Sequence, residues 1–109
     1  MDSDNELRFG ELKSAFAEFK DAIIEGDKDR AFVRYQKFKV LSAMILDSLE
    51  SDGVTSHFRE ESGRIQCFLE YELGFRSNRG YCSDFDGAEF ILGEDLATRY
   101  RYEESRGFH

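Results

Sequence analysis

The stretch "FGELKSAFAEFKDAIIEGDKDRAFVRYQKF", residues 9–38, decides the fold of this chain. Apolar side chains recur in its first half at steps of three and four residues, the spacing of one helical face: Phe9, Leu12, Phe16, Phe19 and Ile23. Gly26 then offers a C-terminal cap, and Asp27 offers an N-cap for a second helix. Because only these two residues separate the helices, we predict an antiparallel hairpin with helices at about 4–25 and 28–51.

The second predicted helix is apolar on nearly every side beyond Lys39, so it must be covered on more than one face. A third helix at about 56–73, closed by Gly74, supplies further cover through a set of apolar residues: Phe58, Ile65, Phe68, Leu69 and Leu73. We therefore predict a mainly α fold, with a three-helix bundle over 1–76 of a single domain that spans 1–109. Two neighbouring helices do not enclose the second helix fully, which favours a homodimer over a monomer.

Residues 77–109 form an acidic, aromatic segment that we expect to pack on the bundle. Within it, "LATRYRY" (96–102) alternates as a half-buried strand does, and it could pair with "EFIL" (89–92) as a hairpin. The same residues also permit a helix. Because a lone hairpin is marginally stable, we favour a short fourth helix, although 88–104 stay open between helix and hairpin.

Composition excludes several classes of protein. With 40% apolar and 15% aromatic residues among 109, the chain is too hydrophobic to be disordered. The net charge of −8 argues against nonspecific binding to nucleic acid or to anionic membranes, since both attract cations. Two cysteines are too few for a disulfide scaffold, and no apolar run approaches the length of a membrane span. We expect a cytoplasmic protein that does not enter a membrane.

The acidic loop "CSDFDG" (82–87) resembles the opening of a calcium-binding loop, in which acidic residues precede a glycine. If Gly87 takes the glycine position, however, Cys82 and Gly93 occupy positions that need an Asp and a bidentate Glu. Zinc is no better served, because no close pair of Cys or His ligands exists. We expect neither a metal nor another cofactor.

Signatures of catalysis are also missing. The sequence has no nucleophile elbow, no phosphate loop and no dinucleotide-binding glycine pattern. We therefore expect a protein that is not an enzyme, and a small enzyme is the least favoured alternative.

A basic stripe, defined by Arg30, Arg34 and Lys37, lies on one face of the second predicted helix. We expect the first helix to neutralise this basic stripe with acidic residues that run past it in the hairpin: Glu18, Asp21 and Glu25. The alternative is a phosphate-binding face, which would make the chain a nucleic-acid-associated regulator.

Acidic residues and aromatic rings alternate after residue 80, where rings can supply contact area and carboxylates can steer a basic partner. The candidate partner-binding residues are Asp84, Phe85, Asp86, Glu94, Asp95, Tyr100 and Tyr102. We expect a small acidic protein-binding module, of an inhibitor, immunity or antitoxin type, that occludes a basic functional site on a partner protein. A segment that merely folds back over the bundle, with its charges in water, explains the same pattern almost as well.

Overall fold

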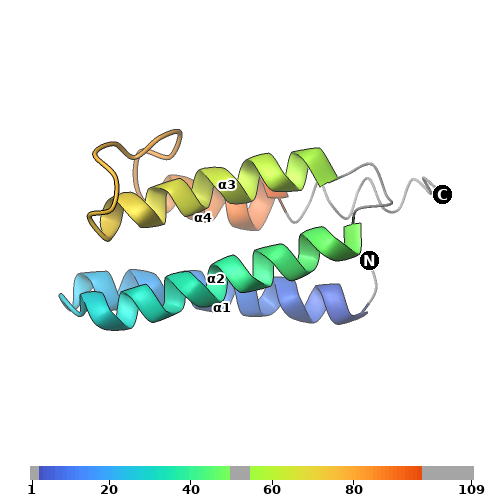
Figure 1. Ribbon diagram of the computed structural model, residues 1–109, viewed down its shortest axis with the longest axis horizontal. Coiled ribbons are helices and arrows are strands. Elements are labelled where there is room, and N and C mark those ends of the chain that lie inside the picture. Colours follow the sequence, from blue (N-terminus) through green and yellow to red (C-terminus); the bar gives the residue numbers. More distant parts are fainter. Residues whose placement is uncertain (1–2, 50–54, 97–109) are drawn as a thin grey trace.

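The first three helices form the predicted antiparallel bundle (Figure 1). They are α1 (Ser3–Ile24), α2 (Lys28–Leu49) and α3 (Thr55–Glu72). The structure is a computed structural model that describes residues 3–49 and 55–96. The mainly α class is confirmed, and each described helix end lies within about two residues of its expected position, the usual uncertainty of a helix boundary.

The turn between α1 and α2 is built as the sequence predicts. Gly26 has a φ of +76°, and the N–H groups of Gly26 and Asp27 donate to the carbonyls of Ile23 and Ala22, which closes α1. The carboxylate of Asp27 then accepts a hydrogen bond from the N–H of Arg30 at 3.0 Å and caps α2. Asp27 thus helps to close α1 through its N–H and caps α2 through its carboxylate.

The end of α3 repeats this arrangement. Gly74 has a φ of +85°, and the N–H of Phe75 donates to the carbonyl of Glu70 at 2.8 Å. The ring of Phe75 then lies against Phe32 of α2, with the centroids 5.8 Å apart. This contact joins the connection after α3 to the hairpin.

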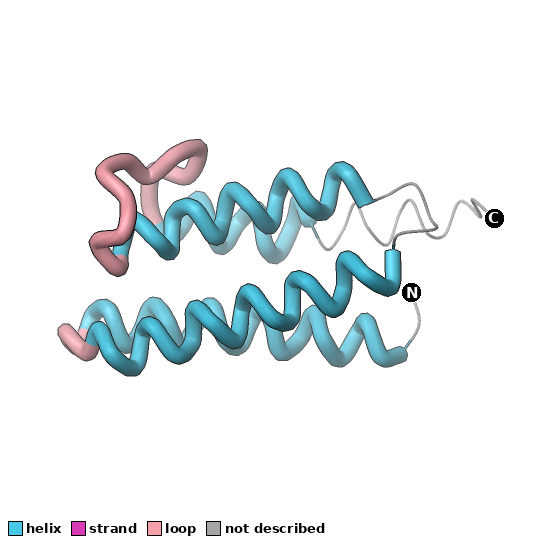
Figure 2. The backbone as a smooth tube through the Cα atoms, in the orientation of Figure 1, coloured by secondary structure: helices cyan, strands magenta, loops and turns pink. Residues whose placement is uncertain are grey.

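A second layer is completed by α4 (Phe85–Phe90), which continues directly into the π-helix η1 (Ile91–Leu96). In Figures 1 and 2 the α1–α2 hairpin forms one layer, and α3 with α4 forms the other. The preference for a short fourth helix is confirmed for 88–96, and the helix begins three residues earlier than expected, at Phe85. A hairpin that uses 89–92 is wrong, because those residues are helical, whereas 97–102 lie outside the described residues.

The hydrophobic core draws buried side chains from α1, α2, α3 and α4–η1: among them Phe9, Leu12, Phe16, Phe19, Phe38, Ile45, Phe58, Ile65, Phe68, Leu69, Ala88 and Leu92. α2 is buried along one side only. Its outer side leaves Val33, Val40 and Met44 exposed in fractions of 55%, 59% and 42%. As expected, the neighbouring helices do not enclose α2 fully, since among the described residues its outer side keeps these apolar side chains exposed. Among these residues no helix combines the length and hydrophobicity needed to cross a bilayer.

Candidate protein-binding surface

The short helix α4 is positioned by Asp84. Its backbone is extended, and its carboxylate accepts a hydrogen bond from the N–H of Gly87 at 2.8 Å. Asp84 is therefore the N-cap of α4. The same Asp84 and Gly87 suggested a calcium-binding loop in the sequence, and here they are joined by the capping hydrogen bond. Over the described residues, no group of three or more His, Cys, Asp or Glu side chains is placed to hold a metal ion.

Phe85 is the ring of α4 that points into the bundle. Phe85, the first residue of α4, is half-buried and packs edge-to-face on Phe68 of α3, with the centroids 5.0 Å apart. It also lies 6.0 Å from Phe16 and 6.2 Å from Phe19 of α1. The structure thus places this candidate partner-binding residue between α1 and α3, where its ring docks α4 onto the bundle.

Two other rings face solvent. Tyr81 and Phe90 are exposed in fractions of 68% and 63%. Both line a shallow hollow of about 390 Å³, whose other walls are Cys82, Ser83, Gly87 and Ile91. The sequence shows both rings among the acidic residues, but it gives no sign that they, and not Phe85, are the exposed pair.

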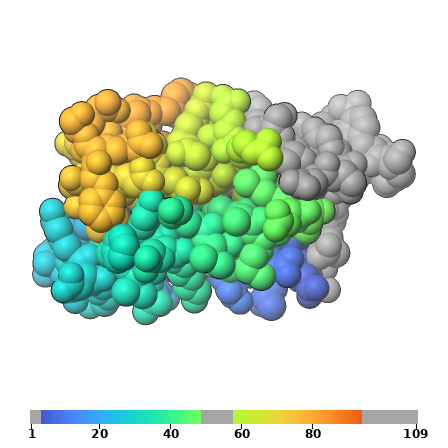
Figure 3. Space-filling model, viewed as in Figure 1, coloured from blue at the N-terminus to red at the C-terminus, as the bar shows by residue number. Residues whose placement is uncertain are grey.

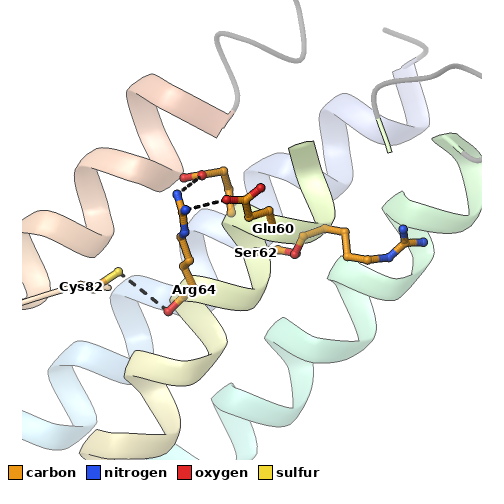
Figure 4. Close-up of polar contacts among 6 residues, drawn as sticks. Glu60, Ser62, Arg64 and Cys82 are labelled. Atoms are coloured by element: carbon orange, nitrogen blue, oxygen red, sulfur yellow. Dashed lines mark hydrogen bonds and ion pairs between the residues drawn. The ribbon is translucent and has the colours of Figure 1, made fainter. Parts of the chain in front are cut away.

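Arg64 of α3 holds one wall of this hollow in place. Its guanidinium donates to Glu60 at 2.5 Å and to Glu61 at 2.6 Å, and it lies over the Tyr81 ring, 4.1 Å from the centroid. Its backbone carbonyl accepts a hydrogen bond from the Cys82 thiol at 3.8 Å (Figure 4). Burial raises the pKa of that thiol to about 11, so Cys82 stays protonated at neutral pH and serves as a donor.

The acidic candidates divide into described and undescribed positions. Asp84 and Asp86 are exposed, and neither forms an ion pair with any residue that the structure describes. Glu94 and Asp95 belong to η1, but their side chains lie outside the described part of the chain. Tyr100 and Tyr102 lie outside it altogether. Asp84 and Asp86 are therefore exposed acidic residues that adjoin, in the chain, the wall residues Ser83 and Gly87.

The basic stripe of α2 is largely neutralised by α1, as the sequence predicts. Arg34 pairs with Glu18 at 2.7 Å, and Arg30 pairs with Glu25. Lys37, the third member of the basic stripe, has no ion pair within the described residues. Two of the three cations are therefore occupied by carboxylates that a phosphate group would have to displace.

A second polar cluster joins α2, α3 and the connection after α3. The Tyr35 hydroxyl and the Arg76 guanidinium each donate to the Glu70 carboxylate at 2.5 Å. Burial alone would raise the pKa of Glu70, but the hydrogen bonds from Tyr35 and Arg76 outweigh it and hold that pKa below its usual value. Burial and the bond to Glu70 raise the pKa of Tyr35.

This cluster predicts acid-sensitive stability. The folded state favours ionised Glu70, so this carboxylate adds to the free energy of unfolding. Its stabilisation is fully present above pH ~4.5, the usual pKa of Glu in an unfolded chain, and it is lost as pH falls through the lower pKa of Glu70 in the folded protein. We expect Glu70→Gln to lower the free energy of unfolding by about 1–2 kcal/mol at neutral pH, and by progressively less in acid. Urea unfolding followed by circular dichroism between neutral pH and pH ~3 measures this difference. Glu60→Gln, at a more exposed carboxylate, is the control; a Glu70→Gln deficit that stays constant with pH contradicts the prediction.

Comparisons with known proteins give this surface no precedent: no family model, curated protein or solved structure matches the chain.

Proposed function

We propose that this chain is a small acidic protein-binding module that covers a basic functional site on another protein, as inhibitors and immunity or antitoxin proteins do. The observation that carries the proposal is the pair of exposed rings, Tyr81 and Phe90, which line one hollow, together with the exposed carboxylates of Asp84 and Asp86, the chain neighbours of its wall residues Ser83 and Gly87. Aromatic anchors and flanking charges are the features that give a protein interface its affinity and its association rate. No catalytic role is part of this proposal.

The alternative, a nucleic-acid-associated regulator, receives less support. It depends on the basic stripe of α2, in which Arg30 and Arg34 already pair with α1 carboxylates. The net charge of −8 opposes it as well.

We also propose that the protein resides in the cytoplasm, in keeping with free Cys67 and Cys82. Finally, we propose a homodimer, since α2 has an exposed apolar side.

The ring residues are tested first. The full chain, a Phe90→Ala variant and a Tyr81→Ala variant serve as baits to capture partners from the native host. We expect the parent chain to capture a basic protein. Either variant should bind that protein with an affinity about thirtyfold lower than the parent does, which is the effect of losing a hot-spot residue. Ile24→Ala, which removes an apolar side chain exposed in a fraction of 71% on α1, is the matched control and should bind normally.

The charges are tested separately through association rates. Asp84→Asn keeps an oxygen that can cap α4 but removes the charge, so it separates steering from folding. Together with Asp86→Asn it should slow association and flatten its salt dependence, whereas Glu11→Gln on α1 should do neither. If Arg30→Glu with Arg34→Glu abolishes partner binding while all α4 and Tyr81 variants bind normally, the proposal is wrong and the alternative replaces it.

A further inference from the structure

The outer side of α2 presents an apolar strip that no described residue covers. Val33, Val40 and Met44 follow one another at steps of seven and four residues, so they share one face of the helix. All three are exposed, whereas Phe38 and Ile45 on the opposite face are fully buried. Figure 3 shows α2, in teal and green, at the surface beside α3 and the connection that follows it.

Two opposite charges flank the Val40 and Met44 part of this strip. Lys37 lies one turn before Val40, and Asp47 lies one turn after Met44. Both are exposed, and neither pairs with any residue in the described ranges 3–49 and 55–96. Lys37 differs in this respect from Arg30 and Arg34, which α1 neutralises. Between residues 37 and 47, the outer side of α2 therefore runs from a cation, through Val40 and Met44, to an anion, and neither charge is paired within the described residues.

We infer, on the basis of the proposed homodimer, that α2 packs antiparallel against α2 of a second copy, about a two-fold axis that passes midway between Val40 and Met44. This arrangement places Val40 against the partner subunit's Met44, and Lys37 against the partner subunit's Asp47. Each contact occurs twice, because a two-fold interface is self-complementary.

The antiparallel direction follows from charge. A parallel pair would place Lys37 near the partner's Lys37 and Asp47 near the partner's Asp47, and it would align the two helix dipoles. The antiparallel pair reverses both effects. The walls of the Tyr81–Phe90 hollow come from α4, η1 and the connection before α4, and none of them belongs to α2.

The test is the mass of the full chain by sedimentation equilibrium at tens of micromolar. We expect twice the chain mass of 12.7 kDa for the parent and for Leu7→Asp, a control at an exposed site on α1. Val40→Asp should be a monomer. Lys37→Glu should weaken the dimer about tenfold, because it turns two attractive contacts into repulsive ones, and adding Asp47→Lys should restore it.

Each outcome bears on a different part of the inference. A monomeric parent overturns the homodimer and this interface together, without touching the partner-binding role of Tyr81 and Phe90. A Val40→Asp variant that stays dimeric leaves the homodimer but overturns α2 as its surface. A charge exchange that fails to restore the dimer overturns the antiparallel pairing. Circular dichroism checks folding, and the Lys37 and Asp47 variants, at exposed sites, keep the test decisive if Val40→Asp unfolds.

Discussion

Phe85→Ala is expected to lower the free energy of unfolding by about 2–4 kcal/mol, towards the lower end of the range for aromatic truncation because the ring is only half-buried. The variant loses edge contacts with Phe68 and Phe16 that hold α4 on the bundle. Urea unfolding followed by circular dichroism measures the change. Phe90→Ala is the matched control: it makes the same substitution on the same helix at a site exposed in a fraction of 63%, and it should change stability by less than about 0.5 kcal/mol.

The pair of variants also separates stability from binding. Phe90→Ala should keep its stability and lose partner affinity, whereas any binding defect of Phe85→Ala should follow from the loss of α4. If Phe85→Ala unfolds at the parent's midpoint, its ring does not hold α4 to the core, and the original expectation that Phe85 contacts a partner returns.

Gly80→Ala is expected to cost about 2–3 kcal/mol, from two sources that can be measured apart. Gly80 has a φ of +70°, a conformation in which an L-residue costs about 1–2 kcal/mol. In addition, an added Cβ would lie 2.8 Å from Sγ of Cys67, so that one of them must move.

A double-mutant cycle in urea separates the two sources. In a Cys67→Ala background the contact with sulfur is absent, and only the backbone cost of Gly80→Ala should remain. Gly63→Ala is the control, because it lies within α3 with open space around its Cα, and it should be neutral or stabilise the fold by up to about 1 kcal/mol. An identical cost of Gly80→Ala in both backgrounds contradicts the predicted contact with Cys67.

The bundle could be predicted because its signals are local. Gly26 and Gly74 sit at positions where a positive φ ends a helix, and the long helices repeat their apolar spacing several times. The pairing of Arg34 with Glu18 followed from the hairpin, since the turn is too short for any other direction. Each of these steps needed only residues that lie close together in the chain.

The candidate surface could be predicted only in part. Its acidic and aromatic character is visible in the sequence, but six residues of α4 are too few to establish a helical period. With Asp84 as the N-cap, the spacing of Phe85, Ala88 and Leu92 forms an inward stripe that leaves Phe90 outside. Nothing local distinguishes a cap from a metal ligand at Asp84, so the inward ring and the outward ring are set by tertiary packing.

Arg64 contacts two successive residues of the connection between α3 and α4, and these contacts affect the entropy cost of binding a partner. Its guanidinium lies over the ring of Tyr81, and its carbonyl accepts a hydrogen bond from Cys82, the next residue. An exposed tyrosine usually loses rotamer freedom when a partner immobilises it, and that loss of entropy weakens binding. Tyr81 is already restrained before any encounter, so a partner that contacts its ring would meet a preorganised group and keep more of the contact energy as affinity.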